Sequence, residues 1–244
     1  MSGAAQGRVQ LASQAEHAPA LAVVIGGGGI GGALAAALQA DPAFAEVLVF
    51  GRASTPGLEL RDEASIAACA RIVAGRGVPR LVFDATGFLH GEGIQPEKSL
   101  RQLDPAHLAH AFAINAIGPA LLMKHFLPLL PTSGRAVFAT LSAKVGSIGD
   151  NRLGGWYAYR ASKAALNQLV RTAAIELRRR NPVAVCVALH PGTVDTGLSA
   201  PFAKAGLQVQ HPAQAAERLL GVLAGLGPQD SGEFFSYRGE RLPW

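Results

Sequence analysis

The chain has 244 residues, of which 49% are hydrophobic and 16% are charged. This length is enough for one large core, and the composition suits a sheet buried on both faces while excluding a disordered or fibrous chain. The formal net charge of +5 permits an anionic ligand, but so small an excess does not indicate a nucleic-acid-binding protein.

Several other kinds of site are also disfavoured. Arg178–Arg180 end a predicted helix, where cations interact favourably with the helix dipole, so we expect no nucleic-acid partner. Cys69 and Cys186 are too few for a disulfide framework or a zinc centre. His107 and His110 could share a helix face, but no further ligand accompanies them, so we expect no metal ion.

The sequence also bears on location. Residues 1–20 contain no apolar run that resembles a signal peptide, and no later segment offers 18 uninterrupted apolar residues. We therefore expect a cytoplasmic protein without a membrane partner.

Short β-branched runs alternate with alanine-rich helical patterns, in the βαβ order of a parallel sheet. The predicted strands are residues 21–25, 47–50, 57–60, 80–84, 135–141, 183–189 and 232–236. The predicted helices are residues 31–39, 63–74, 105–130, 157–180 and 212–226.

These elements predict an α/β protein: a three-layer, doubly wound Rossmann fold with a seven-stranded parallel sheet. We expect one domain over residues 20–244, preceded by a flexible tail over residues 1–19. In such sheets ligands bind beyond the carboxyl ends of the strands, so the loops that follow strands are the places to look for a site.

A glycine-rich turn, Gly26 to Gly32, follows the first predicted strand and opens the first helix. Glycine lets the backbone approach a pyrophosphate, whose charge the N–H groups at the helix N-terminus then hold. A glycine run by itself is as often an ordinary loop, but its place between a strand and a helix favours a dinucleotide. We expect that cofactor to contact Gly26, Gly29, Ile30 and Gly31.

The end of the second strand discriminates between dinucleotides. An acidic residue there would accept hydrogen bonds from the ribose hydroxyls of NAD, whereas this chain has Phe50-Gly51-Arg52. Arg52 would instead bind the 2′-phosphate of NADP, so NADP is favoured over NAD. The alternative is that Arg52 is an ordinary exposed arginine.

Tyr159 and Lys163 are four residues apart at the start of a strong helical pattern, so they share one face of the helix. A phenol has a pKa of about 10, and a fixed ammonium beside it brings that pKa toward neutrality. The spacing thus predicts a proton-transfer pair, whereas Tyr157 points to another part of the helix. Taken alone, the signal is weak, because such a pair is far more often ordinary helix surface.

The glycine turn, Tyr159 and Lys163 together resemble the short-chain dehydrogenase/reductase superfamily, whose motifs span most of this chain. The resemblance implies that Asn115 and Ser142 complete a catalytic tetrad with Tyr159 and Lys163. Outside that context, Asn115 could relieve a helix kink before Pro119, and Ser142 could cap a turn.

The resemblance also implies further cofactor contacts. Residues 83–87 would border the adenosine, Glu59 would lie at the adenine, and residues 191–196 would meet the nicotinamide carboxamide. The cofactor residues expected on this basis are Glu59, Ala85, Thr86, Gly87, Asn115, Tyr159, Lys163, Pro191, Gly192, Val194 and Thr196.

The chain departs from the superfamily pattern at three positions. Gly26 and Gly29 enclose two residues instead of the usual three, which affects the cofactor geometry. Asp84 and Thr86 stand where the superfamily more often has Asn and Ala. These changes concern adenosine binding rather than the chemistry.

Within the superfamily, residues 145–151 and 239–244 resemble the C-factor and sniffer-type carbonyl reductase group. The resemblance implies an NADP-dependent oxidoreductase that reduces a ketone or aldehyde, or oxidises a secondary alcohol, with Tyr159 as general acid/base. A dinucleotide-binding sensor or signalling protein with little turnover is the alternative.

The resemblance bears on partners as well. Relatives often pair through the helices that contain Asn115 and Tyr159, which implies a homodimer or homotetramer. The predicted lid, residues 197–204, is small and apolar, and it suggests an apolar small-molecule substrate.

Overall fold

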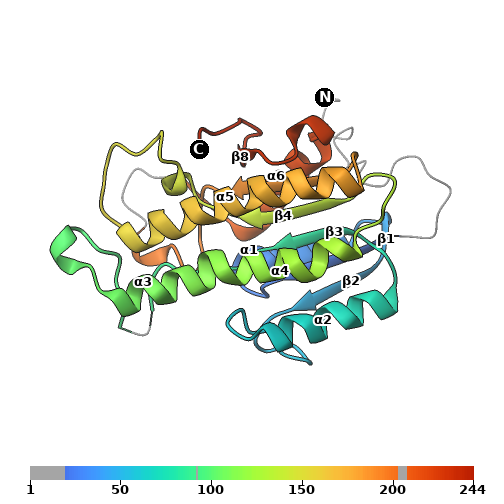
Figure 1. Cartoon of the computed structure of the whole chain (residues 1–244), viewed down its shortest axis with the longest axis horizontal. Coiled ribbons are helices and arrows are strands. Elements are labelled where there is room, and N and C mark those ends of the chain that lie inside the picture. The colour runs from blue at the N-terminus through green and yellow to red at the C-terminus, as the bar shows by residue number, and fades with distance from the viewer. Residues whose placement is uncertain (1–19, 92, 203–207) are drawn as a thin grey trace.

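The computed structural model describes residues 20–91, 93–202 and 208–244, so the predicted N-terminal tail lies outside the described residues. Within those ranges one main sheet has the strand order β2-β1-β3-β4-β5-β8, with every neighbouring pair parallel (Figure 1). Its strands are β1 (Ala20–Ile25), β2 (Phe44–Phe50), β3 (Pro79–Asp84), β4 (Val137–Leu141), β5 (Val185–His190) and β8 (Phe234–Ser236).

The predicted seven-stranded sheet is wrong by one strand, because residues 57–60 form a loop. The apolar alternation that suggested a strand comes from Leu58 and Leu60, two buried anchors that fix this loop to the core. The loop bonds to itself rather than to a neighbouring strand: the Leu58 N–H donates to the Gly51 carbonyl at 2.9 Å. A separate two-stranded ribbon pairs β6 (Thr193–Val194) with β7 (Val209–Gln210).

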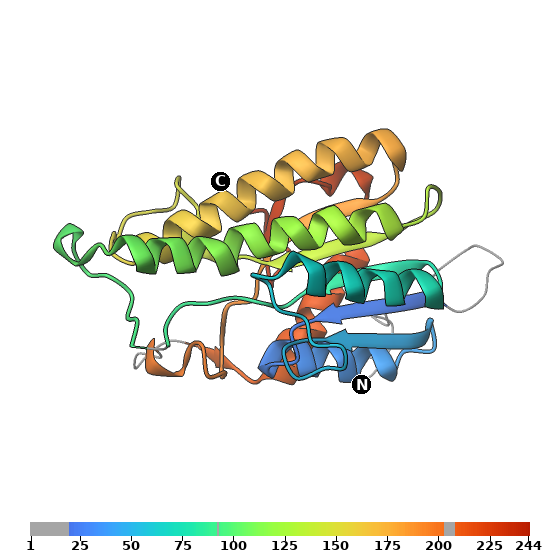
Figure 2. The ribbon, with the colours of Figure 1, turned by 60° about the horizontal axis from the view of Figure 1, so that its bottom comes forward.

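Helices cover both faces of the main sheet, as the alternating pattern predicts (Figures 1 and 2). On one face α1 (Gly29–Gln39) packs beside α6 (Pro212–Gly225). On the other, α4 (Gly118–Phe126) contacts both α2 (Glu63–Arg76) and α5 (Tyr157–Arg180).

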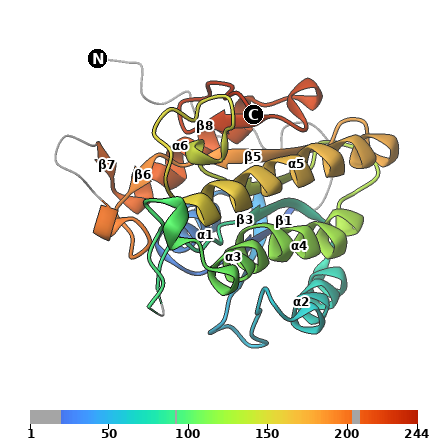
Figure 3. The ribbon, with the colours of Figure 1, turned by 60° about the vertical axis from the view of Figure 1, so that its left-hand side comes forward.

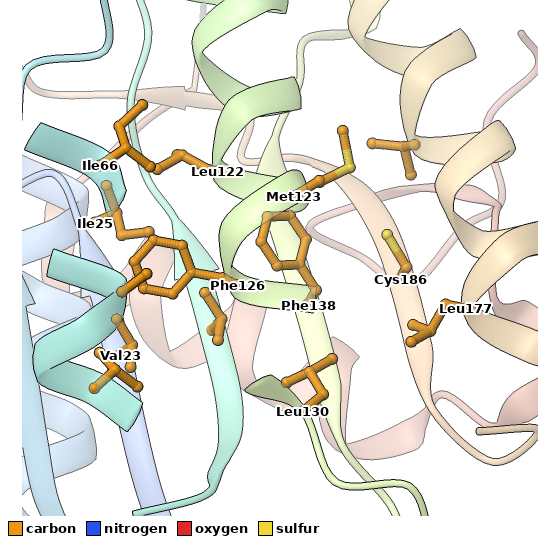
Figure 4. Close-up of a cluster of buried hydrophobic side chains, with 14 of the residues drawn as sticks. Val23, Ile25, Ile66, Leu122, Met123, Phe126, Leu130, Phe138, Leu177 and Cys186 are labelled. Carbon is orange, nitrogen blue, oxygen red and sulfur yellow. The ribbon is translucent and has the colours of Figure 1, made fainter. Parts of the chain in front are cut away.

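Successive residues of each strand serve the two faces in turn, which explains their almost continuous apolar sequences. In β1, Val23 and Ile25 belong to the cluster under α2, α4 and α5, whereas Ala22 and Val24 belong to the cluster under α1 and α6. Figure 4 shows the first cluster, where Phe126 of α4 lies close to the β1 and β3 side and Phe138 points up from β4.

The predicted helix over residues 105–130 is interrupted in the structure. It consists of α3 (Pro105–Phe112), a π-helical turn at Ala113–Ile117, α4 and a final 3-10 turn at Leu127–Leu129. The Asp104 carboxylate caps α3 by accepting from the His107 N–H at 2.8 Å. A π-helical turn inserts an extra residue per turn and is common at functional sites. Here it contains the buried Asn115.

Among the described residues, this same stretch, Pro105–Leu129, is the one helix long and apolar enough to cross a membrane. Length and composition alone are weak evidence, because the core helix of a folded domain meets the same criteria. Here 44% of the most apolar window is buried in the molecule, and α4 packs between α2 and α5. The apolar face is therefore used inside the fold.

The carboxyl ends of the strands meet at one end of the molecule, which Figure 3 brings forward. The start of α5, the start of α3 and the β6–β7 ribbon gather at this end. Trp244 links the loop before α5 to β8. The Gly149 N–H donates to the Trp244 carbonyl at 2.8 Å, and the Trp244 ring stacks on Phe234.

Candidate active site

The glycine turn is closed tightly against the sheet. The Gly26 N–H donates to the Phe50 carbonyl of β2 at 2.7 Å, and Gly26 has a φ of +100°, which side chains rarely allow. A Cβ on Gly31 would lie 1.7 Å from the Gly26 carbonyl oxygen. The helix can therefore begin this close to the strand only with glycine at both positions.

The short spacing between Gly26 and Gly29 departs from the superfamily pattern, and the structure explains it through Gly28. Sequence reasoning did not single out this residue. Gly28 is the N-cap of α1, so Gly26, Gly28 and Gly31 follow the G-x-G-x-x-G spacing of a dinucleotide-binding turn. That spacing was the available signal. Gly29 has a different use, because a Cβ there would lie 2.7 Å from Thr196 Cγ2. Gly29 thus admits the loop after β5.

Arg52 is the second residue after β2, and its backbone is next to this turn. Its neighbour Gly51 approaches the turn so closely that a Cβ there would lie 3.4 Å from the Gly27 nitrogen. The Arg52 side chain is exposed. The Glu59 carboxylate accepts from the Arg61 N–H at 3.2 Å.

Residues 84–87 pack against the other side of the glycine turn. The Ala85 N–H donates to the Ile25 carbonyl at 2.8 Å, and a Cβ on Gly26 would lie 3.2 Å from the Ala85 carbonyl group and 3.3 Å from Thr86 Cγ2, closer than ordinary van der Waals contact. The buried Asp84 carboxylate accepts from Thr86 Oγ1 and Thr140 Oγ1, each at 2.6 Å. Burial raises the pKa of Asp84, and these hydrogen bonds and the charge of Lys163 oppose the rise.

Asn115 is held rigidly by the chain after β3. Its Oδ1 accepts from the Phe88 N–H at 2.8 Å, while its Nδ2 donates to the Phe88 carbonyl at 2.7 Å and to Ser162 Oγ at 3.1 Å. A Cβ on Gly87 would lie 3.8 Å from Asn115 Oδ1 and 3.7 Å from Lys163 Nζ. The structure therefore brings Gly87, Asn115 and Lys163 together.

Lys163 is buried on α5, one turn after Tyr159, and its Nζ donates to the Leu141 carbonyl at 2.7 Å. Burial lowers the pKa of Lys163 to about 8, against the opposing charge of Asp84. The ammonium is thus close to titration at physiological pH.

The expected lowering of the Tyr159 pKa is not found. Tyr159 is half-buried, and burial raises its pKa. The physical reason is that Lys163 Nζ is bonded to the Leu141 carbonyl instead of the phenol, so desolvation of the phenolate dominates. Tyr159 is therefore a protonated phenol at neutral pH.

Ser142 follows β4 and is anchored to β5 by a 2.8 Å hydrogen bond from its N–H to the Leu189 carbonyl. Its Oγ donates to Asn167 Oδ1 at 2.7 Å. Asn167 lies one turn beyond Lys163 on α5, so the side chains of Tyr159, Lys163 and Asn167 form one stripe along the helix. Sequence reasoning missed Asn167, although its i+8 spacing from the tyrosine was visible.

The loop after β5 is shaped by Gly192, whose φ is +79° and whose Cβ would collide with Gln210 Nε2 at 2.5 Å. Gln210 Nε2 also donates to the Pro191 carbonyl at 2.9 Å. Val194 is buried in β6, and Thr196 reaches the glycine turn at Gly29. Residues 191–196 therefore run between the end of β5 and α1. Gln210 supports this loop, and no sequence pattern indicated it.

Aromatic rings cluster near Tyr159. The Trp156 ring makes edge contacts with Tyr159 at 6.2 Å and with Phe202 at 5.2 Å between centroids. His90 contacts Phe202 from the other side at 5.2 Å, and its Nε2 lies 3.1 Å from the Gly197 carbonyl. The predicted lid thus contributes Gly197 and Phe202 to an apolar wall, while Ala203 and Lys204 lie outside the described residues.

Buried groups fix the start of α5. Trp156, the N-cap, has a φ of +52°, and its N–H donates to the Glu97 carbonyl at 2.5 Å. The Glu97 carboxylate accepts from the Ala158 N–H at 3.2 Å and lies 3.0 Å from His107 Nδ1. A carboxylate at a helix N-terminus stabilises it, so Glu97 holds Tyr159 in place through the helix.

Known proteins match most of the chain. A family model described as Enoyl-(Acyl carrier protein) reductase matches residues 57–221, more than half of the chain. The 1-hydroxy-2-glutathionyl-2-methyl-3-butene dehydrogenase of Rhodococcus sp. (strain AD45) is 32% identical over 200 residues, covering 82% of this chain and 84% of that protein. C-signal of Myxococcus xanthus is 40% identical over 147 residues, covering 60% of this chain and 84% of that protein.

Solved structures are similar over almost the whole chain. The NADPH-bound carbonyl reductase from chicken fatty liver has a TM-score of 0.79 and 25% identity, covering 97% of this chain and 98% of that one. The carbonyl reductase Sniffer of D. melanogaster also has a TM-score of 0.79, with 23% identity, and covers 93% of this chain and 100% of that one. At the latter identity the likeness shows the fold alone.

Proposed function

Because this chain belongs to the short-chain dehydrogenase/reductase superfamily of oxidoreductases, we propose that it is an NADPH-dependent reductase of ketones or aldehydes. The observation that carries the proposal is the convergence of Gly87, Asn115 and Lys163, with Tyr159 one helical turn before the lysine. The ends of β1 and β3, which lead into the glycine turn and Gly87, are paired neighbours in the sheet. The direct test of the proposal is the carbonyl-dependent consumption of NADPH by the purified protein.

The residues divide the work of such a reduction. NADPH, when bound, would supply the hydride. The hydroxyl of Ser142 would hold the carbonyl oxygen, and Tyr159 would donate its proton to that oxygen as hydride reaches the carbon. Lys163 would hold the nicotinamide ribose, and Asn115 would hold a water molecule that links the lysine to solvent. Positioning and proton transfer are therefore what this chain contributes.

The protonation state of Tyr159 supports reduction over alcohol oxidation. Reduction needs a phenol that donates a proton, whereas oxidation needs a phenolate that accepts one. Burial raises the pKa of Tyr159, so the proton-donating form is present at neutral pH. A raised phenol pKa therefore favours the reducing direction at neutral pH.

The rate of reduction should fall in alkali because Lys163 loses its proton. Since its pKa is lowered to about 8, the ammonium is present below that pH and is lost as pH rises through it. We therefore expect kcat/KM for NADPH, measured with saturating carbonyl substrate, to be level in acid and to decline above about pH 8.

The control for this profile is Lys163→Arg, in which the cation stays charged throughout. Any activity that it retains should lack the decline. A wild-type profile that stays level to strong alkali would contradict the role of the lysine.

Arg52 should select NADPH over NADH. Loss of a charge-assisted contact to the 2′-phosphate by Arg52→Ala should raise the Kd for NADPH by about ten- to a hundredfold, while the Kd for NADH stays unchanged. Both constants can be measured by fluorescence titration. Arg71→Ala, which removes an exposed arginine of α2, is the matched control and should change neither constant. Equal effects of Arg52→Ala on both cofactors would refute the assignment.

A second candidate is a dinucleotide-binding signalling protein with little turnover. The 40% identity to C-signal of Myxococcus xanthus favours it. Cofactor binding without turnover over a broad panel of carbonyl compounds would distinguish this function from a reductase.

Copies of the chain are also proposed to pair, through the helical face formed by α4 and α5. Two large apolar side chains are exposed there: Ile117, before α4, at 54%, and Ile175, on α5, at 48%. Analytical ultracentrifugation of the purified protein would give the assembly state.

A further inference from the structure

Asn167 stands out among the buried polar residues near the proposed site. Its side chain is 3% exposed, as is that of Ser142, and its Oδ1 accepts the Ser142 hydroxyl at 2.7 Å. Its Nδ2 is buried and has no hydrogen-bond partner within the described part of the chain. A buried amide that leaves a donor unused needs an explanation.

Two other buried asparagines use both atoms of their side-chain amides. Asn181 uses both amide atoms: Nδ2 donates to the Pro131 carbonyl at 2.7 Å and Oδ1 accepts from the Val183 N–H at 3.1 Å. Asn115 also uses both, on Phe88 and Ser162. Asn167 alone among these three keeps half of its amide free, and it does so against Ser142.

The direction of the Ser142 hydrogen bond matters for the chemistry. A serine hydroxyl has one proton, and in the structure that proton points to Asn167 Oδ1. It is then not available to a carbonyl oxygen, which is an acceptor only. A half-turn of the Asn167 amide exchanges its two atoms, so that Nδ2 donates to Ser142 Oγ and the serine proton becomes free.

The half-turn keeps the number of hydrogen bonds within the pair unchanged. In one orientation Nδ2 is without a partner, and in the other Oδ1 is. The two orientations are therefore close in energy, and an added acceptor next to Ser142 decides between them.

We propose that Asn167 is a positioning residue for carbonyl reduction, whose amide reverses to turn the Ser142 proton toward the substrate oxygen. This inference rests on the proposed function. It assigns no contact between Asn167 and the substrate.

Two substitutions separate this role from a structural one. Asn167→Asp keeps the shape but, when ionised, can only accept, so it holds the Ser142 proton away from the substrate. The charge of Lys163, one turn earlier on α5, favours the ionised form and burial opposes it, as at Asp84, so kcat is compared at a pH where the variant carboxyl is ionised. Asn167→Leu removes both functions and leaves the serine proton free, while Asn167→Ala replaces it if the leucine variant does not fold.

We expect Asn167→Asp to lower kcat by about a hundredfold, as for loss of an oxyanion donor, and Asn167→Leu by only about tenfold. Rates are expressed per NADPH-binding site, so misfolded protein does not count, and the Kd for NADPH should stay unchanged in both. The same two substitutions at Gln168, the exposed next residue of α5, should leave kcat unaffected.

The serine background completes the test. In Ser142→Ala the two Asn167 variants should have the same residual kcat, because no proton remains to be directed. A structural role predicts instead that the isosteric Asp variant is the milder one. A higher kcat for Asn167→Asp than for Asn167→Leu would overturn the inference, and so would a difference in kcat between them that persists in the Ser142→Ala background. Wild-type turnover would uphold the proposed function in either case. A wild type without turnover would refute both.

Discussion

Tyr159→Phe is expected to lower kcat for carbonyl reduction by about a thousandfold or more, because it removes the proton donor and nothing else. The ring remains, so its edge contact with Trp156 and the packing of α5 should persist. The Kd for NADPH should therefore be nearly that of the wild type. Steady-state rates and a fluorescence titration of the same preparation give both quantities.

Tyr157→Phe is the matched control, since Tyr157 is on the same helix turn and also loses only a hydroxyl. Its kcat should equal that of the wild type. Substantial reductase activity in Tyr159→Phe, or an equal loss in the two variants, would show that another group supplies the proton.

Gly31→Ala should largely abolish NADPH binding. The added Cβ would lie 1.7 Å from the Gly26 carbonyl oxygen and 3.3 Å from the Ala85 Cβ, so the turn must open. The N–H groups at the start of α1 then lose the arrangement that would hold a pyrophosphate. Overpacking at this site should also lower the free energy of unfolding by about 1–3 kcal/mol.

Gly32→Ala, one residue further along α1, separates the two effects of adding a methyl group. There the new Cβ has open space, with the Gly27 carbonyl oxygen at an ordinary 3.6 Å. In a helix alanine is favoured over glycine, so stability should rise by about 0.5–1 kcal/mol, with NADPH affinity retained. Urea unfolding and cofactor titration test both variants. Equal NADPH affinities in Gly31→Ala and Gly32→Ala would show that the glycine turn does not bind the cofactor.

The fold was largely predictable because short apolar strands alternate along the sequence with alanine-rich helices, in the order that a parallel sheet requires. Two predictions failed for identifiable reasons. Leu58 and Leu60 mimic a strand since the anchors of a loop can alternate like strand residues. The helix over residues 105–130 contains a π-helical turn at Ala113–Ile117, which the continuous apolar pattern does not reveal.

The candidate site was predictable where spacing along one element defines it, as for Tyr159 and Lys163. Contacts between elements distant in sequence were not. Asn167 meets Ser142 across 25 positions, and Glu97 caps α5 from 61 positions away. The Tyr159 pKa also depends on burial and on where Lys163 Nζ is bonded, and neither can be read from a four-residue spacing.

The central claim, reduction of a carbonyl compound with NADPH, is tested most directly by titrating the purified protein with NADPH and NADH and then adding a panel of ketones and aldehydes. Nicotinamide absorbance and product analysis are followed together. The account predicts tighter binding of NADPH and its consumption in step with alcohol formation. Binding of neither cofactor, or NADPH binding without any alcohol formed across the panel, would contradict it.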